Sequence, residues 1–179
     1  AMLLIGRTIE PGKETLLTAL PLYHIFAFTV NLFLFIHLGG RNILIPSPRP
    51  LSNVKRAFEN YPISWMTGVN TLFNGLLNEY WFKEYPPKHL KYSVAGGMAL
   101  QRSVAERWQE LTKTEVVEGY GLTEASPVLT FNPFGKNKPG TIGVPLPGTK
   151  IRCVNDAGED MKPGSPGEII AMGPQIMQG

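Results

Sequence analysis

The chain has 179 residues, of which 43% are hydrophobic and 17% charged, a balance that is typical of a globular domain with a core and argues against disorder. The formal net charge is only +3, and the lysines and arginines are scattered along the sequence, so we expect no nucleic-acid partner. A single cysteine, Cys153, excludes an intrachain disulfide and suits a reducing cytoplasm.

Up to Gly121, short β-prone runs alternate with segments long enough for a helix. The runs predict strands over residues 16–20, 42–45, 64–68, 92–95 and 115–118. Helical spacing of apolar residues predicts helices over 25–38, 52–60, 72–80 and 101–111. Such alternation favours an α/β fold with a largely parallel sheet and helices on both faces, because parallel strands need right-handed crossovers.

Residues 25–38 form the most apolar stretch. The stretch is shorter than a bilayer span and is interrupted by Thr29, Asn31 and His37. We therefore interpret it as a buried helix.

After Gly121 the prolines become frequent and helical spacing is lost. Residues 142–144, 150–154 and 168–171 are predicted strands, and Asn155 to Gly158 has the residue types of a tight turn. This pattern predicts a small antiparallel β unit. We divide the chain into an α/β subdomain, residues 1–126, and a β-rich subdomain, residues 127–179.

Ligands of open α/β sheets collect at the carboxyl ends of the strands, and the last predicted parallel strand leads into a suggestive loop. The loop reads Glu118, Gly119, Tyr120, Gly121, Leu122, Thr123 and Glu124. The two glycines permit close approach to a flat ligand, and Tyr120 offers a ring to a base. Thr123 can bind a phosphate oxygen, whereas Glu124 fits beside phosphate only if Mg²⁺ lies between them. The alternative is a glycine turn with Glu124 as a capping group.

Two other strand ends are candidates. Gly96 and Gly97, followed by Met98, would let backbone approach a ligand or would simply make the bend. His24, preceded by Tyr23, ends a strand and opens the apolar helix. A histidine at such a place is either a catalytic group or a capping and core group.

Several other chemistries lack their motifs. The sequence has no Gly-x-Ser-x-Gly elbow and no Walker-type phosphate loop, and His37 and His89 have no metal-ligand companions at useful spacing. Phe28 belongs to a group of phenylalanines that either lines an acyl tunnel or forms ordinary core.

Taken together, three segments resemble, in order, the core motifs of the adenylate-forming superfamily. They are residues 20–24, 96–98 and 118–124. Residues 140–145 and 164–168 resemble later motifs of the same family, so the resemblance covers essentially the whole chain.

Within that superfamily the chain is most similar to bacterial long-chain fatty-acid:CoA ligases. Phe26 and Phe28, residues 67–73 and residues 105–108 carry this finer resemblance. It implies that a fatty acid reacts with ATP to give an acyl-adenylate, which CoA then converts to a thioester.

The resemblance also implies roles for individual residues. Nucleotide contacts would come from Gly96, Gly97, Met98, Glu118, Gly119, Tyr120, Gly121, Leu122 and Thr123. Thr123 would bind phosphate, Glu124 would hold Mg²⁺, and His24 would act at the reacting carboxyl group. Tyr23, His24 and Phe28 would line the fatty-acid tunnel.

The sequence departs from the family pattern in three ways. It lacks the Ser/Thr/Gly-rich phosphate loop and the C-terminal lysine domain, and Ala95 stands where relatives often have a third glycine. We therefore expect a fragment that is inactive without the missing parts of its parent chain. Two alternatives stay open: a non-catalytic nucleotide- or acyl-binding module, and an adenylating ligase for aryl or medium-chain acids. We expect a cytoplasmic location, with weak association of the full-length enzyme with the inner face of the membrane as an open alternative.

Overall fold

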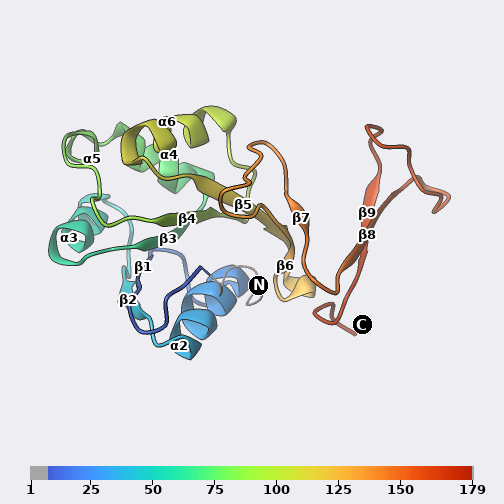
Figure 1. The fold of residues 1–179 in the computed structure, drawn as a ribbon, viewed down its shortest axis with the longest axis horizontal. Coiled ribbons are helices and arrows are strands. Elements are labelled where there is room, and N and C mark those ends of the chain that lie inside the picture. Colours follow the sequence, from blue (N-terminus) through green and yellow to red (C-terminus); the bar gives the residue numbers. More distant parts are fainter. Residues whose placement is uncertain (1–7, 179) are drawn as a thin grey trace.

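A computed structural model describes residues 8–178, which form a seven-stranded sheet, helices on both of its faces and a separate two-stranded hairpin (Figure 1). The strand order in the large sheet is β2-β1-β3-β4-β5-β6-β7. The parallel strands are β1 (Thr15–Thr18), β2 (Arg41–Leu44), β3 (Trp65–Gly68), β4 (Tyr92–Ala95) and β5 (Val116–Gly121). Each overlaps a predicted strand, so the α/β class with a largely parallel sheet is confirmed.

Two further strands continue the sheet in the antiparallel sense. They are β6 (Val128–Phe131), which pairs with β5, and β7 (Val144–Pro145), which pairs with β6. The sequence does not predict β6, because Pro127 and Pro133 flank this short run and are typical of loops. The large sheet therefore continues across the predicted boundary between residues 126 and 127.

Helices pack on both faces of the sheet, and each face has its own hydrophobic core. One face carries α3 (Ser52–Asn60), α4 (Asn70–Asn78), α5 (Tyr80–Glu84) and α6 (Arg102–Thr112). In Figure 1, α4, α5 and α6 are drawn above the strands and α3 at the left. Because side chains alternate along a strand, Leu17 and Met66 belong to this core, whereas Leu16 and Trp65 belong to the other.

A single helical segment covers the opposite face. It consists of α1 (Ile25–Ala27), the π-helix η1 (Phe28–Leu34) and α2 (Phe35–His37). Phe28, Phe33 and Ile36 are exposed, so the expectation of a buried helix is correct for only one side of it. Nowhere within residues 8–178 does a helix reach the length and apolarity that a bilayer crossing requires.

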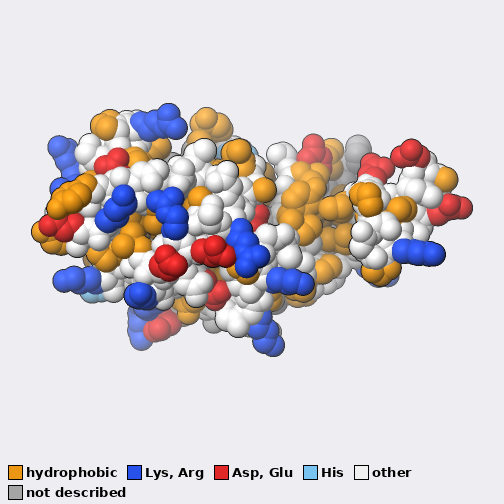
Figure 2. Space-filling view, turned by 90° about the horizontal axis from the view of Figure 1, so that it is seen from above, with side chains coloured by type: hydrophobic (Ala, Val, Ile, Leu, Met, Phe, Trp, Pro, Cys, Tyr) orange, Lys and Arg blue, Asp and Glu red, His pale blue; other side chains and the backbone are white. Residues whose placement is uncertain are grey.

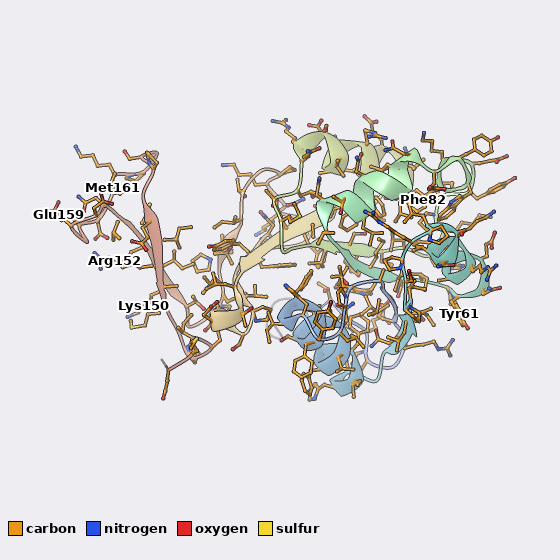
Figure 3. The ribbon with its side chains drawn as sticks, turned by 180° about the vertical axis from the view of Figure 1, so that it is seen from behind. Tyr61, Phe82, Lys150, Arg152, Glu159 and Met161 are labelled. Atoms are coloured by element: carbon orange, nitrogen blue, oxygen red, sulfur yellow. The ribbon has the colours of Figure 1, made fainter. Side chains whose placement is uncertain are left out.

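The strands β8 (Lys150–Val154) and β9 (Glu168–Met172) form an antiparallel hairpin that projects from the sheet (Figure 1). The predicted small antiparallel unit is thus confirmed. Figure 3 shows Lys150 and Arg152 on this hairpin, at the opposite end of the molecule from Tyr61. Hydrophobic side chains gather where the hairpin meets the body (Figure 2), and the exposed apolar residues include Ile169, Ile170 and Met172.

At the amino end of the sheet, a buried carboxylate is paired with a partly exposed lysine. The Glu14 side chain is fully buried just before β1, and the Nζ of Lys91, just before β4, lies 3.0 Å from Glu14 Oε1. The hydrogen bond to Glu14 raises the pKa of Lys91. This pair ties together two strand entrances that are far apart in the sequence.

We predict that Lys91→Met lowers the free energy of unfolding by about 2–3 kcal/mol at neutral pH, because the Glu14 charge loses its partner. The raised pKa of Lys91 means that its contribution is complete below the unfolded value of about 10.4 and is lost as the pH rises through the folded value. Urea unfolding of the complete protein should therefore show a gap between wild type and variant that narrows above about pH 10.4. The control is Lys83→Met, on the exposed side of α5; equal losses in both variants would contradict the role of the pair.

Candidate functional site

A cavity of about 250 Å³ lies at the carboxyl ends of β1, β4 and β5. Its polar and glycine lining comes from three separate parts of the chain: His24, Gly96, Gly97, Gly119, Tyr120, Gly121, Thr123 and Glu124. Its apolar lining includes Phe26, Val30, Val94, Val128 and Phe131. The structure thus brings together residues from the three strand-end loops that the sequence singled out.

His24 is the N-cap of α1, the first part of the helical segment formed by α1, η1 and α2. Its Nδ1 accepts a hydrogen bond of 3.3 Å from the backbone N–H of Phe26. A neutral imidazole that accepts at Nδ1 carries its proton at Nε2, so the ring presents a donor on its other side. Capping and a role at the cavity are therefore compatible, although the sequence analysis treated them as alternatives.

Gly96 and Gly97 bring the β4 loop against the start of the same helix. A Cβ at Gly96 would lie 3.1 Å from the Phe26 ring, and Gly97 has a φ of +76°. Gly96 therefore fits against a side chain of this chain, while Gly97 supplies a backbone angle that other residues rarely adopt.

Gly121 has a structural reason to be glycine. A β-bulge interrupts the pairing of β5 and β6 between Tyr120 and Gly121, and the Leu122 N–H donates to the Pro127 carbonyl at 2.9 Å. A Cβ at Gly121 would lie only 1.8 Å from that carbonyl oxygen. The glycine thus permits β6 to fold back tightly onto β5, which places the next residues over the cavity.

The turn after the bulge is a short 3-10 helix, Thr123–Ala125, with Thr123 and Glu124 exposed. The backbone carbonyl of Glu124 accepts a hydrogen bond of 2.8 Å from the Met177 N–H. Within residues 8–178, no hydrogen bond or ion pair engages the Glu124 carboxylate. The backbone of the turn is anchored, and its carboxylate is free to act on a ligand.

The part of the chain that the structure describes contains no group of three His, Cys, Asp or Glu side chains that could hold a metal ion by themselves. Mg²⁺ is usually bound by one or two carboxylates together with waters and phosphate oxygens. Glu124, whose carboxylate has no partner among residues 8–178, lines the cavity together with Thr123 and fits such a shared site rather than an all-protein one.

Four predicted site residues do not line this cavity. Met98 is exposed, and Tyr23 is 91% exposed and borders a different, apolar cavity near β2. Glu118 is buried, and its Oε1 accepts a hydrogen bond of 2.9 Å from the Leu100 N–H. Phe28 points its ring at Phe33 on the exposed side of the helix, with centroids 4.6 Å apart. Their predicted roles stay predictions.

The sequence alone does not predict the apolar wall of the cavity. Val128 and Phe131 lie on β6, which was not predicted as a strand, and Val30 was treated only as part of an apolar helix. The one available signal is the short run of β-prone residues between the two prolines, Val128 to Phe131. It was too short to distinguish a strand from a loop.

Comparison with known proteins identifies a family and several relatives that the chain matches. Residues 2–179 match the profile of a family described as AMP-binding enzyme. The chain is 49% identical over 172 residues to a long-chain-fatty-acid–CoA ligase of Yersinia pestis, an alignment that covers 96% of this chain and 31% of that protein. The chain therefore spans about a third of the length of the curated relatives it matches.

Solved structures show the same fold. A benzoate CoA ligase from Burkholderia xenovorans superimposes with a TM-score of 0.90 at 22% identity, over 98% of this chain and 35% of that one. O-succinylbenzoate coenzyme A synthetase from Bacillus subtilis, in complex with ATP and magnesium ion, gives a TM-score of 0.79 at 26% identity, over 93% and 34% of the two chains.

We predict that Gly121→Ala destabilises the complete protein by about 3 kcal/mol or more, because the added Cβ overlaps the Pro127 carbonyl in an already bulged pairing. A suitable control is Gly75→Ala in α4, where the new Cβ meets only the movable end of Leu51 at 3.1 Å. Thermal unfolding of both variants measures the difference. The contact would be unimportant if the two midpoints fell by the same amount.

Proposed function

Because this chain belongs to the AMP-binding enzyme family, we propose that it contributes the adenylate cavity of a long-chain fatty-acid:CoA ligase. The observation that supports this most is the convergence of His24, the Gly96 loop and residues 119–124 on one cavity, where the Glu124 carboxylate has no hydrogen bond or ion pair with any other described residue. The 49% identity to a long-chain-fatty-acid–CoA ligase supports the substrate class. The likeness to a benzoate CoA ligase, at 22% identity, concerns the fold alone.

The proposed reaction has two steps. A fatty-acid carboxylate attacks the α-phosphorus of ATP, which forms an acyl-adenylate and releases pyrophosphate. The CoA thiol then attacks the acyl carbon, so that a thioester forms and AMP leaves. The protein parts outside this chain must supply whatever else the complete cycle needs.

The residues at the cavity have complementary tasks in this proposal. The ring of Tyr120 and the backbone around Gly96 hold the adenine, and the Thr123 hydroxyl donates to a phosphate oxygen. His24 donates from Nε2 to an oxygen at the reacting carboxyl group, where negative charge accumulates in the transition state. The cap to Phe26 fixes the ring so that little reorganisation is needed at that moment.

Magnesium fits the proposal through Glu124. Glu124 would hold the ion, and the chemistry that Mg²⁺ would supply is positive charge that neutralises the ATP oxygens. The task of Glu124 itself is to present a negative charge at a fixed place, which the Met177 hydrogen bond to its backbone carbonyl supports.

We predict that Glu124→Gln in the complete protein lowers ATP–pyrophosphate exchange by at least about a hundredfold and leaves the circular dichroism spectrum unchanged, because the group is needed for charge rather than packing. Glu110→Gln, which changes another exposed carboxylate, this one on α6, is the matched control. Exchange at the wild-type rate in Glu124→Gln would reject the metal-binding role.

For the acyl tunnel, Phe28→Ala should change the ratio of kcat/KM for long over medium acyl chains by about tenfold, with little change in the KM for ATP. Ile36→Ala removes another exposed apolar side chain from the same helical segment and serves as the control. Competition assays with mixed fatty acids provide the measurement. An unchanged chain-length profile in Phe28→Ala would assign its ring to surface packing with Phe33 instead.

A further inference from the structure

A polar network is buried beneath the helical segment that carries His24. Asn31, in the π-helix η1, is 0% exposed. Its Nδ2 donates to the Thr18 hydroxyl at 3.0 Å and to the Thr67 hydroxyl at 2.8 Å. The Thr67 hydroxyl in turn donates to Asn31 Oδ1 at 3.1 Å. One amide thus joins the helix to β1 and β3.

Asn42 on β2 closes the network into a ring. The Thr18 hydroxyl donates to Asn42 Oδ1 at 2.7 Å, and Asn42 Nδ2 donates to the backbone carbonyl of Asn31 at 2.7 Å. Each polar atom of the Asn31 amide has a partner, and the helix backbone itself is held. Three adjacent strands are therefore connected to one residue of the helix.

A buried polar network is unusual at this interface between the helical segment and the sheet. The neighbouring buried residues Val30, Leu34 and Phe35 already bury apolar surface against the sheet. Apolar contacts permit small rotations and slides of a helix, whereas buried hydrogen bonds are satisfied in one arrangement and are costly to leave unmade. The network thus sets the rotation and height of the helix more strictly than packing alone.

The position of the helix also determines the position of residues that line the cavity. Val30, next to Asn31, lines the cavity, and Phe26 one turn earlier lies against Gly96 and donates its N–H to His24 Nδ1. A rotation of the helix would move the cavity wall, the Gly96 contact and the His24 ring together. Asn31 touches none of the cavity itself.

We propose that Asn31, with Thr18 and Thr67, forms a positioning device that holds the His24 imidazole in place for adenylate formation. The proposal rests on the proposed function, since it assigns Asn31 a task in the same reaction. It distinguishes two groups on one helix: His24 meets the substrate, and Asn31 acts only through the helix.

The test uses Thr67, because one substitution removes its hydroxyl at nearly constant shape and another keeps it. In the complete protein, Thr67→Val should lower kcat for adenylation by about tenfold to a hundredfold with little change in the KM for ATP, as expected for a misplaced reacting group. Thr67→Ser should remain near wild type. Thr112→Val is the stability control, because the buried Thr112 hydroxyl bonds the Trp108 carbonyl on the other face of the sheet.

A second readout does not depend on activity. The nitrogen chemical shifts of the His24 imidazole should report a fixed Nε2–H tautomer in wild type and in Thr67→Ser. In Thr67→Val the two shifts should move toward each other as the cap to Phe26 loosens. If the complete wild-type protein formed no acyl-adenylate, the proposed function would fail while these shifts still tested the positioning.

Two results would overturn the proposal. One is a kcat in Thr67→Val no lower than in Thr112→Val at matched losses of thermal stability. The other is an unchanged pair of His24 nitrogen shifts in Thr67→Val.

Discussion

The tight return of β6 onto β5 is the constraint on which the candidate site depends. Parallel strands bring their carboxyl ends to one edge, but an open edge would leave the loops there unsupported. Here the chain reverses within a few residues, with the Gly121 backbone against the Pro127 carbonyl and Leu122 bonded to the same oxygen. Because of this reversal, Val128 and Phe131 form part of the apolar lining of the cavity. Thr123 and Glu124, in the turn itself, contribute polar groups to the same lining.

The sequence predicted much of this architecture, because in the parallel strands and their helices the local spacing of apolar residues matches the faces that the fold buries. Residues 52–60 and 92–95 have the predicted bounds, since apolar spacing there matches the face that is buried. Prediction failed where a distant partner decides the outcome. The strand β6 exists because β5 offers it a free edge, and Glu14 is buried because Lys91, distant in the sequence, reaches it.

Single residues of the site also divide into features that the local sequence predicts and features that depend on distant parts of the chain. Strand ends and residue types predict the loops that meet at the cavity, and the structure adds contacts within the chain that the residue types do not reveal. Gly121 is expected to admit a ligand and lines the cavity, and it also admits a carbonyl of its own chain. His24 was weighed as either cap or catalyst, yet the cap determines which nitrogen can donate. Structural and functional explanations of one residue therefore need not compete.

The charge of Glu124 affects what the cavity can bind. The Glu124 carboxylate is exposed, so in the unliganded chain water solvates it at little cost. A nucleotide phosphate entering the cavity would displace that water and meet a negative charge, and among the described residues no lysine or arginine lines this cavity to compensate. In the proposed function, binding of the phosphates is therefore coupled to binding of a divalent cation, which would offset the like charges. In that proposal, the Glu124 carboxylate disfavours ATP without metal and favours ATP together with metal, a discrimination that a neutral residue at this position would not provide.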